Sequence, residues 1–146
     1  WRLKTLFFHI IPTVFILQLF LTAAMSDDRI ALCSSADLRD GGLAVSFDVV
    51  FGGQTCPAFA VRYHGAVYAY VNRCSHVALE LDWQPNKVFD ASGCYLVCAN
   101  HGAIFAPDTG ACLGGPGRGP LQKILCSEEN GRVYWHTAWN LRPPLF

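Results

Sequence analysis

Four side chains in two short segments have the types and spacing of metal ligands. Cys74 and His76 form a Cys-x-His pair, and Cys98 and His101 form a Cys-x-x-His pair after the interval 77–97. Thiolate sulfur and imidazole nitrogen are preferred ligands of zinc and of iron. Each segment offers one donor of each type, so the two together predict a metal site with four protein ligands.

Two kinds of metal site fit this donor set. The first is a tetrahedral Cys2His2 zinc site, although structural zinc sites commonly place two cysteines in one short segment and two histidines in the other. Here each segment mixes the two types. The second is an iron–sulfur cluster, whose edge must stay near a redox partner and which the glycine- and proline-rich residues 114–120 could cover. We favour the cluster and keep zinc as the alternative.

The elements that position these segments read as short strands. Apolar runs with alternating or β-branched residues recur about every eight to twelve residues, separated by glycine, proline and asparagine turns. Strands are expected at 30–33, 44–51, 58–63, 66–72, 88–90, 95–98, 103–106, 111–113, 121–126 and 132–137. Runs 58–63 and 66–72 are expected to form a hairpin around His64-Gly65, and runs 121–126 and 132–137 another around 128–131, where Asn-Gly suits a turn with positive φ. Two of these runs lead directly to Cys74 and Cys98. The sequence therefore predicts an all-β domain of small antiparallel sheets, as a sandwich or a partly open barrel.

Several aromatic residues fall on or between these runs, with alternating neighbours. We expect them in the core rather than in an exposed stacking surface. They are Tyr68, Tyr70, Trp83, Tyr134 and Trp135.

The two ligand segments resemble those of a Rieske-type [2Fe-2S] domain, and the likeness extends over about residues 28–137. It rests on Cys74-x-His76, Cys98-x-x-His101-Gly102, Phe105, Thr109-Gly110 and a covering turn at Gly115-Pro116 and Gly119. The resemblance implies an all-β Rieske fold with two cluster-binding loops. It also implies that Cys74 and Cys98 hold one iron, and that His76 and His101 hold the other iron at the solvent edge.

Departures from the family pattern indicate which branch the chain resembles. The Rieske proteins of quinol-oxidising complexes carry a disulfide between the two loops, where this chain has Leu79 and Asn100. They also place serine and tyrosine hydroxyls near the cluster sulfurs, where this chain has Ala103 and Phe105. Fewer hydrogen bonds to sulfur predict a reduction potential in the lower part of the ~ −150 to +300 mV Rieske range. The chain thus resembles soluble Rieske ferredoxins and oxygenase domains.

The resemblance and the composition together predict an electron carrier. The chain has 146 residues and a formal net charge of +0, which gives no basic footprint for nucleic acid. Only His136 follows His101, so no second site with two histidines and a carboxylate for a catalytic iron is expected. We expect a one-electron carrier between a reductase and a terminal acceptor such as an oxygenase. The alternatives are a cluster-based redox or iron sensor and a zinc-stabilised interaction module.

The N-terminal segment 1–24 is set apart from the predicted domain at 28–137. Residues 6–24 carry no formal charge and follow Arg2 and Lys4, which suits a membrane-anchor helix or a cleaved signal. Translation upstream of an ordinary start at Met25 is the third interpretation. The seven cysteines do not form the dense, even framework of a secreted domain. We therefore expect a cytoplasmic protein, with anchoring through residues 6–24 as the alternative.

Overall fold

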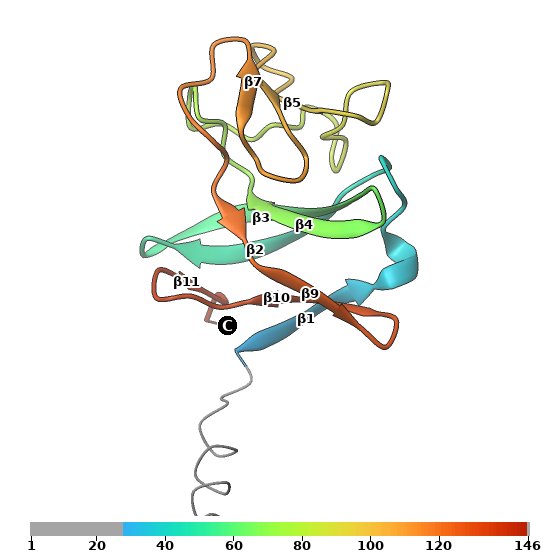
Figure 1. The fold of residues 1–146 in the computed structure, drawn as a ribbon. Coiled ribbons are helices and arrows are strands. Elements are labelled where there is room, and N and C mark those ends of the chain that lie inside the picture. Colours follow the sequence, from blue (N-terminus) through green and yellow to red (C-terminus); the bar gives the residue numbers. More distant parts are fainter. Residues whose placement is uncertain (1–27, 146) are drawn as a thin grey trace, which may run out of the picture.

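The computed structural model describes residues 28–145, which form three antiparallel sheets stacked in layers (Figure 1). The predicted all-β architecture is confirmed, because the only helical element is the short 3-10 turn η1 (Ser35–Asp37) in this described part. No helix within it is long and apolar enough to cross a membrane. The hydrophobic segment 1–24 lies outside the described residues.

The three sheets have the following strands. The five-stranded central sheet has the order β11-β2-β3-β4-β8, with β2 (Val45–Phe51), β3 (Gln54–Tyr63), β4 (Ala66–Val71), β8 (Lys123–Ile124) and β11 (Leu141–Arg142). The base sheet has the order β1-β10-β9, with β1 (Arg29–Ser34), β9 (Cys126–Glu129) and β10 (Arg132–His136). The third sheet has the order β5-β6-β7, with β5 (Leu96–Val97), β6 (Ile104–Phe105) and β7 (Cys112–Gly114).

Tight turns set the register of the two hairpins predicted from the sequence. His64 and Gly65 join β3 to β4 with φ of 48° and 80°. Asn130 and Gly131 join β9 to β10 with φ of 51° and 73°. Positive φ at both central positions gives a turn whose twist matches that of the paired strands, and Asn and Gly adopt it at low cost. The hairpin at His64-Gly65 is confirmed. The turn at Asn130-Gly131 is confirmed too, but its first strand is β9 rather than the expected run 121–126.

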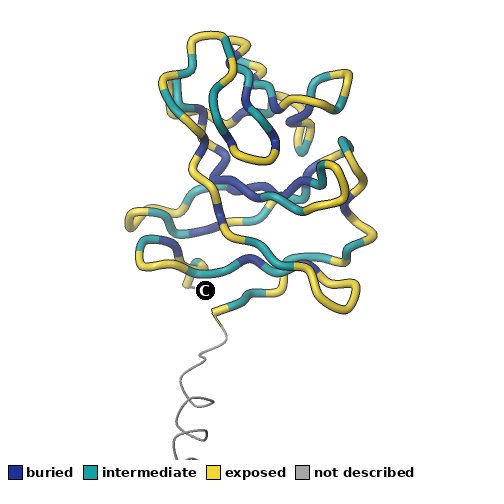
Figure 2. The backbone as a smooth tube through the Cα atoms, viewed as in Figure 1, coloured by how far each residue is buried: buried dark blue, intermediate teal, exposed yellow. Residues whose placement is uncertain are grey.

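The central sheet is buried on both faces because its side chains alternate between two cores (Figure 2). Towards the ligand loops it presents the bulky residues Phe59, Val61 and Tyr70. Towards the base sheet it presents the smaller residues Ala58, Ala60, Ala69 and Val71. The small face leaves room for the base sheet's Trp135 and Val133. The bulky face carries the ligand loops.

One predicted strand is divided between two sheets. The run 121–126 was expected to pair along its length with 132–137, but β8 pairs with β4, and only β9 pairs with β10. The chain changes sheets at Leu125, which is 66% exposed. β11 was not predicted at all, and it extends the central sheet beyond residue 137. Apolar composition alone could not specify either partner, because pairing depends on which sheet edge is open.

The expectation that all five aromatic residues are core residues is wrong for one of them. Tyr70 and Trp135 are buried, at 0% and 3% exposure, and Tyr68 and Tyr134 are half-buried. Trp83, in contrast, is 80% exposed. It lies in an irregular connection between the ligand loops rather than on a strand, so the alternation argument does not apply to it.

An ion pair joins the central sheet to the base sheet and makes stability depend on acid pH. Arg62 Nη2 lies 2.7 Å from Glu128 Oε1, and Arg62 Nε donates to the Leu38 carbonyl at 2.9 Å. The guanidinium hydrogen bond lowers the Glu128 pKa from 4.5 to about 2.

Because the Glu128 pKa is depressed in the folded state, the stabilisation is present above the unfolded pKa and is lost as the pH falls. We expect the free energy of unfolding of the wild type to fall towards that of Glu128→Gln between about pH 4.5 and about pH 2. Urea unfolding at a series of pH values measures this difference. Glu129→Gln, on the same strand but without the Arg62 contact, is the control. A Glu128→Gln difference that does not change with pH would contradict the prediction.

Candidate metal centre

Two strand ends carry the predicted ligands to the end of the molecule opposite the base sheet (Figure 1). Cys74 follows β4 and Cys98 follows β5. Both cysteines are buried, at 6% and 1% exposure, and belong to the core cluster above the central sheet. Each thiol is therefore fixed by packing on the central sheet or the third sheet, although both lie in loops.

The structure brings the four predicted ligands together in pairs. The thiols of Cys74 and Cys98 are near enough for the Cys98 thiol to raise the pKa of the Cys74 thiol. The rings of His76 and His101 meet edge to face with their centroids 4.9 Å apart. His76 is half-buried and His101 is exposed, so the sulfur donors lie inside and the imidazoles lie at the surface.

The chemistry of this group fits a metal cofactor. Nδ1 of His76 is buried without a hydrogen-bond partner among the described residues, and an unsatisfied buried nitrogen is costly unless it has a ligand. Burial raises the pKa of the Cys74 thiol, and the Cys98 thiol raises it further. A bound metal would stabilise the deprotonated thiolate and would give the His76 nitrogen a partner. Within residues 28–145, no three Cys, His, Asp or Glu side chains are grouped to hold a single metal ion.

Hydrogen bonds stabilise the two ligand loops at Leu79 and Asn100, where the Rieske proteins of quinol-oxidising complexes have a disulfide. The Cys74 amide donates to the Leu79 carbonyl at 2.8 Å. The side-chain amide of Asn100 donates to the Glu80 carbonyl at 2.8 Å and lies 3.7 Å from the Cys98 sulfur. Asn100 thus ties the second loop to the connection that ends the first. In the sequence, Asn100 stands out only because it is not cysteine. The link that its side chain makes between the loops could not be predicted without the loop geometry.

The glycine- and proline-rich turn contacts both ligand loops. A Cβ atom placed on Gly115 would lie 2.5 Å from the Gly102 carbonyl oxygen and 2.9 Å from Ala103 Cα, next to the second loop. One placed on Gly117 would lie 2.5 Å from Cys112 Sγ and 3.3 Å from Ser75 Oγ, at the first loop. Only glycine allows so close an approach of backbones. The turn therefore packs against both loops.

Comparisons with known proteins agree on the type of domain. The model of the Rieske [2Fe-2S] domain family matches residues 28–125. No match is found among curated proteins. Among solved structures, the ferredoxin of carbazole 1,9a-dioxygenase from Nocardioides aromaticivorans IC177 is similar, with 25% identity, a TM-score of 0.59, and coverage of 74% of this chain and 96% of that chain.

Two further solved structures show the same fold. Sphingomonas yanoikuyae B1 ferredoxin has 24% identity and a TM-score of 0.59, with coverage of 75% of this chain and 99% of that chain. The terminal oxygenase of carbazole 1,9a-dioxygenase from Novosphingobium sp. KA1 has 25% identity and a TM-score of 0.56, with coverage of 74% of this chain and 29% of that chain. The family match spans more than half of the sequence and includes both ligand loops. This chain therefore belongs to the Rieske [2Fe-2S] domain family.

Proposed function

We propose that Cys74 and Cys98 ligate one iron of a Rieske-type [2Fe-2S] cluster and that His76 and His101 ligate the other. The pairing of the two thiols inside and the two imidazoles at the surface supports this assignment. The unpartnered, buried Nδ1 of His76 is the nitrogen that we assign as its ligand atom. When bound, the cluster accepts and releases one electron, and replacement of two thiolates by neutral imidazoles makes it easier to reduce.

We infer that the protein carries electrons from a reductase to an oxygenase. The single observation that carries this inference is the position of the His76–His101 pair, which lies at the surface and at one end of the domain. The likeness to the ferredoxin of carbazole 1,9a-dioxygenase covers 96% of that chain and 74% of this one, and another solved structure is a complex of reduced oxygenase and oxidised ferredoxin in that system. An interface around this edge would be small and transient, as is usual for redox partners.

Repeated one-electron cycling tests the carrier function. Holoprotein reduced with dithionite is mixed with cytochrome c in a stopped-flow instrument, and the cycle is repeated after reoxidation. We expect one electron delivered per chain and an unchanged cluster spectrum after every cycle. Disassembly of the cluster on each redox cycle would favour a sensor and would contradict the carrier proposal.

We further propose a reduction potential in the lower part of the Rieske range, because Ala103 and Phe105 bring no hydroxyl to the site. Both side chains are fully buried, at 0% exposure. Ala103→Ser should raise the potential by roughly 50 to 100 mV, since a hydrogen bond to a charged group contributes about 1.5–3 kcal/mol and only part of that differs between the two redox states. Potentiometric titration followed by visible circular dichroism measures this. Ala99→Ser, exposed on the same loop, is the control, and equal potentials for both variants would refute the role of the missing hydroxyl.

We propose that the protein is cytoplasmic. All seven cysteines lie within the described residues and none forms a disulfide, which supports a reducing compartment. Anchoring through residues 6–24 is the alternative. Fractionation of cells that express the full sequence decides between them, because an anchored product would sediment with membranes and resist extraction by salt.

A further inference from the structure

The exposed Trp83 lies on a connection that hydrogen bonds hold rigid. Its neighbour Leu81 is fully buried, and the Leu81 amide donates to Asn72 Oδ1 at 2.8 Å. Asn72 Nδ2 donates in turn to Asp82 Oδ1 at 2.7 Å, and the Asn86 amide donates to Asp82 Oδ2 at 2.8 Å. An aromatic side chain that is 80% exposed on so well-fixed a backbone has little packing role of its own.

The same connection is attached to the loop that carries His101. The Ala99 amide donates to the Leu81 carbonyl at 2.8 Å, and the Asn100 side chain donates to the Glu80 carbonyl at 2.8 Å. The backbone that carries Trp83 is therefore tied by hydrogen bonds to the loop that carries His101. A protein that docks against Trp83 contacts the surface beside that loop.

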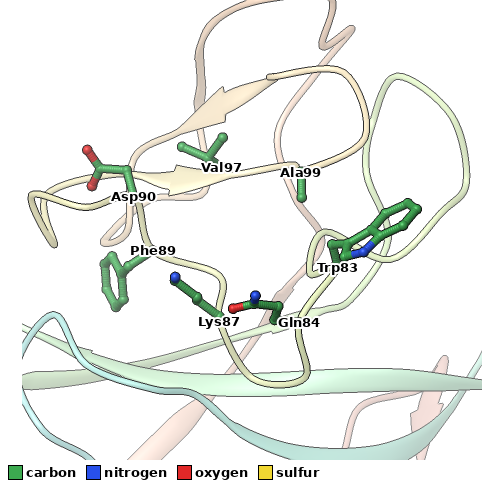
Figure 3. Close-up of a pocket in the computed structure, with 7 residues that line it drawn as sticks. All are labelled: Trp83, Gln84, Lys87, Phe89, Asp90, Val97 and Ala99. Atoms are coloured by element: carbon green, nitrogen blue, oxygen red, sulfur yellow. The ribbon is translucent and has the colours of Figure 1, made fainter.

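A groove of about 320 Å³ lies beside Trp83 (Figure 3). Its apolar lining comes from Trp83, Phe89, Val97 and Ala99, and its polar groups include Lys87 and Asp90. Figure 3 shows the side chains of Val97 and Ala99 on one side of this space and those of Gln84 and Lys87 on the other. We call this space the Trp83 groove. Its volume suits one or two large side chains.

The two charged groups of the groove differ in their partners. Asp90 accepts hydrogen bonds from the Ser92 hydroxyl and from the amides of Cys94 and Tyr95. Hydrogen bonding, mainly from Ser92, lowers the Asp90 pKa and keeps the carboxylate ionised. Lys87 has no carboxylate partner within residues 28–145. The Asp90 oxygens already accept hydrogen bonds from their own turn, so Lys87 is the charged group of the groove that is left open to an incoming carboxylate.

We propose that the Trp83 groove docks the electron-accepting protein by taking an apolar side chain of that partner, with a neighbouring carboxylate placed at Lys87. The inference rests on the proposed carrier function and adds where and by what chemistry the partner is recognised. Val77 and Leu79, 45% and 48% exposed on the adjoining loop, extend the apolar surface towards the ligands. Exposed aromatic residues in such surfaces commonly provide most of the binding energy of an interface.

Peptide display on the holoprotein tests the proposal without a known partner. A random peptide library is selected on immobilised holoprotein, with counter-selection on the holo form of Trp83→Ala. We expect enriched peptides to combine a large apolar residue with a nearby Asp or Glu. Their affinity should fall about tenfold or more in Trp83→Ala, and less in Lys87→Gln, where the salt dependence should also weaken.

A second exposed tryptophan provides a matched control. Trp139 is 87% exposed and belongs to the chain between β10 and β11, away from the ligand loops. Trp139→Ala should leave peptide affinity unchanged. Selection of no peptide that depends on Trp83, or of peptides that bind Trp83→Ala equally well, overturns the proposal, as does enrichment of basic peptides.

Failure of this inference is distinguishable from failure of the carrier function. The stopped-flow cycling described above uses cytochrome c and does not require the groove. If cycling succeeds and the peptide selection fails, the protein remains a carrier with another docking surface. If selection succeeds and cycling destroys the cluster, the groove still binds a partner, but the partner does not receive electrons, and the docking proposal in its stated form is wrong.

Discussion

His101→Ala and Cys98→Ser are each expected to abolish the Rieske-type absorption and electron paramagnetic resonance signals of the purified protein. Each change removes one of the four proposed ligands. The proposal assigns the cluster no other Cys or His that could replace the lost one. The effect should be complete rather than partial, because the iron bound by that residue is left without one of its protein ligands. Iron and acid-labile sulfide analysis measures it directly, with two of each per chain expected in the wild type and almost none in the variants.

Control variants separate ligand loss from a general loss of folding. Cys94 is exposed near β5, and His64 is exposed in the turn before β4. Cys94→Ser and His64→Asn should retain the full iron and sulfide content, because neither side chain faces the ligand pairs, and Asn tolerates the positive φ at position 64. A retained Rieske spectrum in His101→Ala would disprove the ligand assignment. One zinc per wild-type chain and no sulfide would show that the site binds zinc, and the protein would then be the zinc-stabilised interaction module.

Gly115→Ala should displace the covering turn and destabilise the protein by about 2 to 6 kcal/mol. The residue has φ of +75°, and its added Cβ would lie within 3 Å of two backbone atoms, the Gly102 oxygen and Ala103 Cα. Positive φ costs a non-glycine residue about 1–3 kcal/mol, and overpacking against atoms that cannot move costs a further ~1–3 kcal/mol. We also expect faster loss of the cluster in air, because the turn contacts both ligand loops.

Gly119→Ala in the same turn is the matched comparison. No heavy atom lies within 4 Å of its added Cβ. Urea unfolding and the rate of bleaching of the visible absorption should therefore be close to those of the wild type. Equal behaviour of the two variants would show that residues 114–120 form a simple surface turn, with no protective role for the cluster.

Local pattern was sufficient for much of the fold. Strand composition and glycine or asparagine turns predicted the hairpins at His64-Gly65 and Asn130-Gly131, because such turns are set by the φ preference of two adjacent residues. The structure places Cys74 with Cys98 and His76 with His101, which is the pairing that the family resemblance implies. The ligand assignment and the domain limits of 28–137 remain predictions.

Other features depended on contacts between distant residues. At Leu125 the chain passes from the central sheet to the base sheet. This crossing depends on which strand of each sheet has an unpaired edge, and no short sequence pattern encodes that. Trp83 is predicted to be in the core on the strand-alternation argument, yet the connection around it is fixed by Asn72 and Asp82 and leaves the indole exposed. Asn100 links the loops only because Glu80 lies opposite it.

The sequence by itself determined the all-β class and the family, and it singled out the four proposed donors, since these depend on residue type and on spacing along the chain. Only the tertiary structure decided which other groups meet across the chain: Asn100 against Glu80, the covering turn against Gly102, and the groove beside Trp83. The physical reason is that close packing and hydrogen bonding act between neighbours in space, and the neighbours of a loop are set by the sheets that hold it.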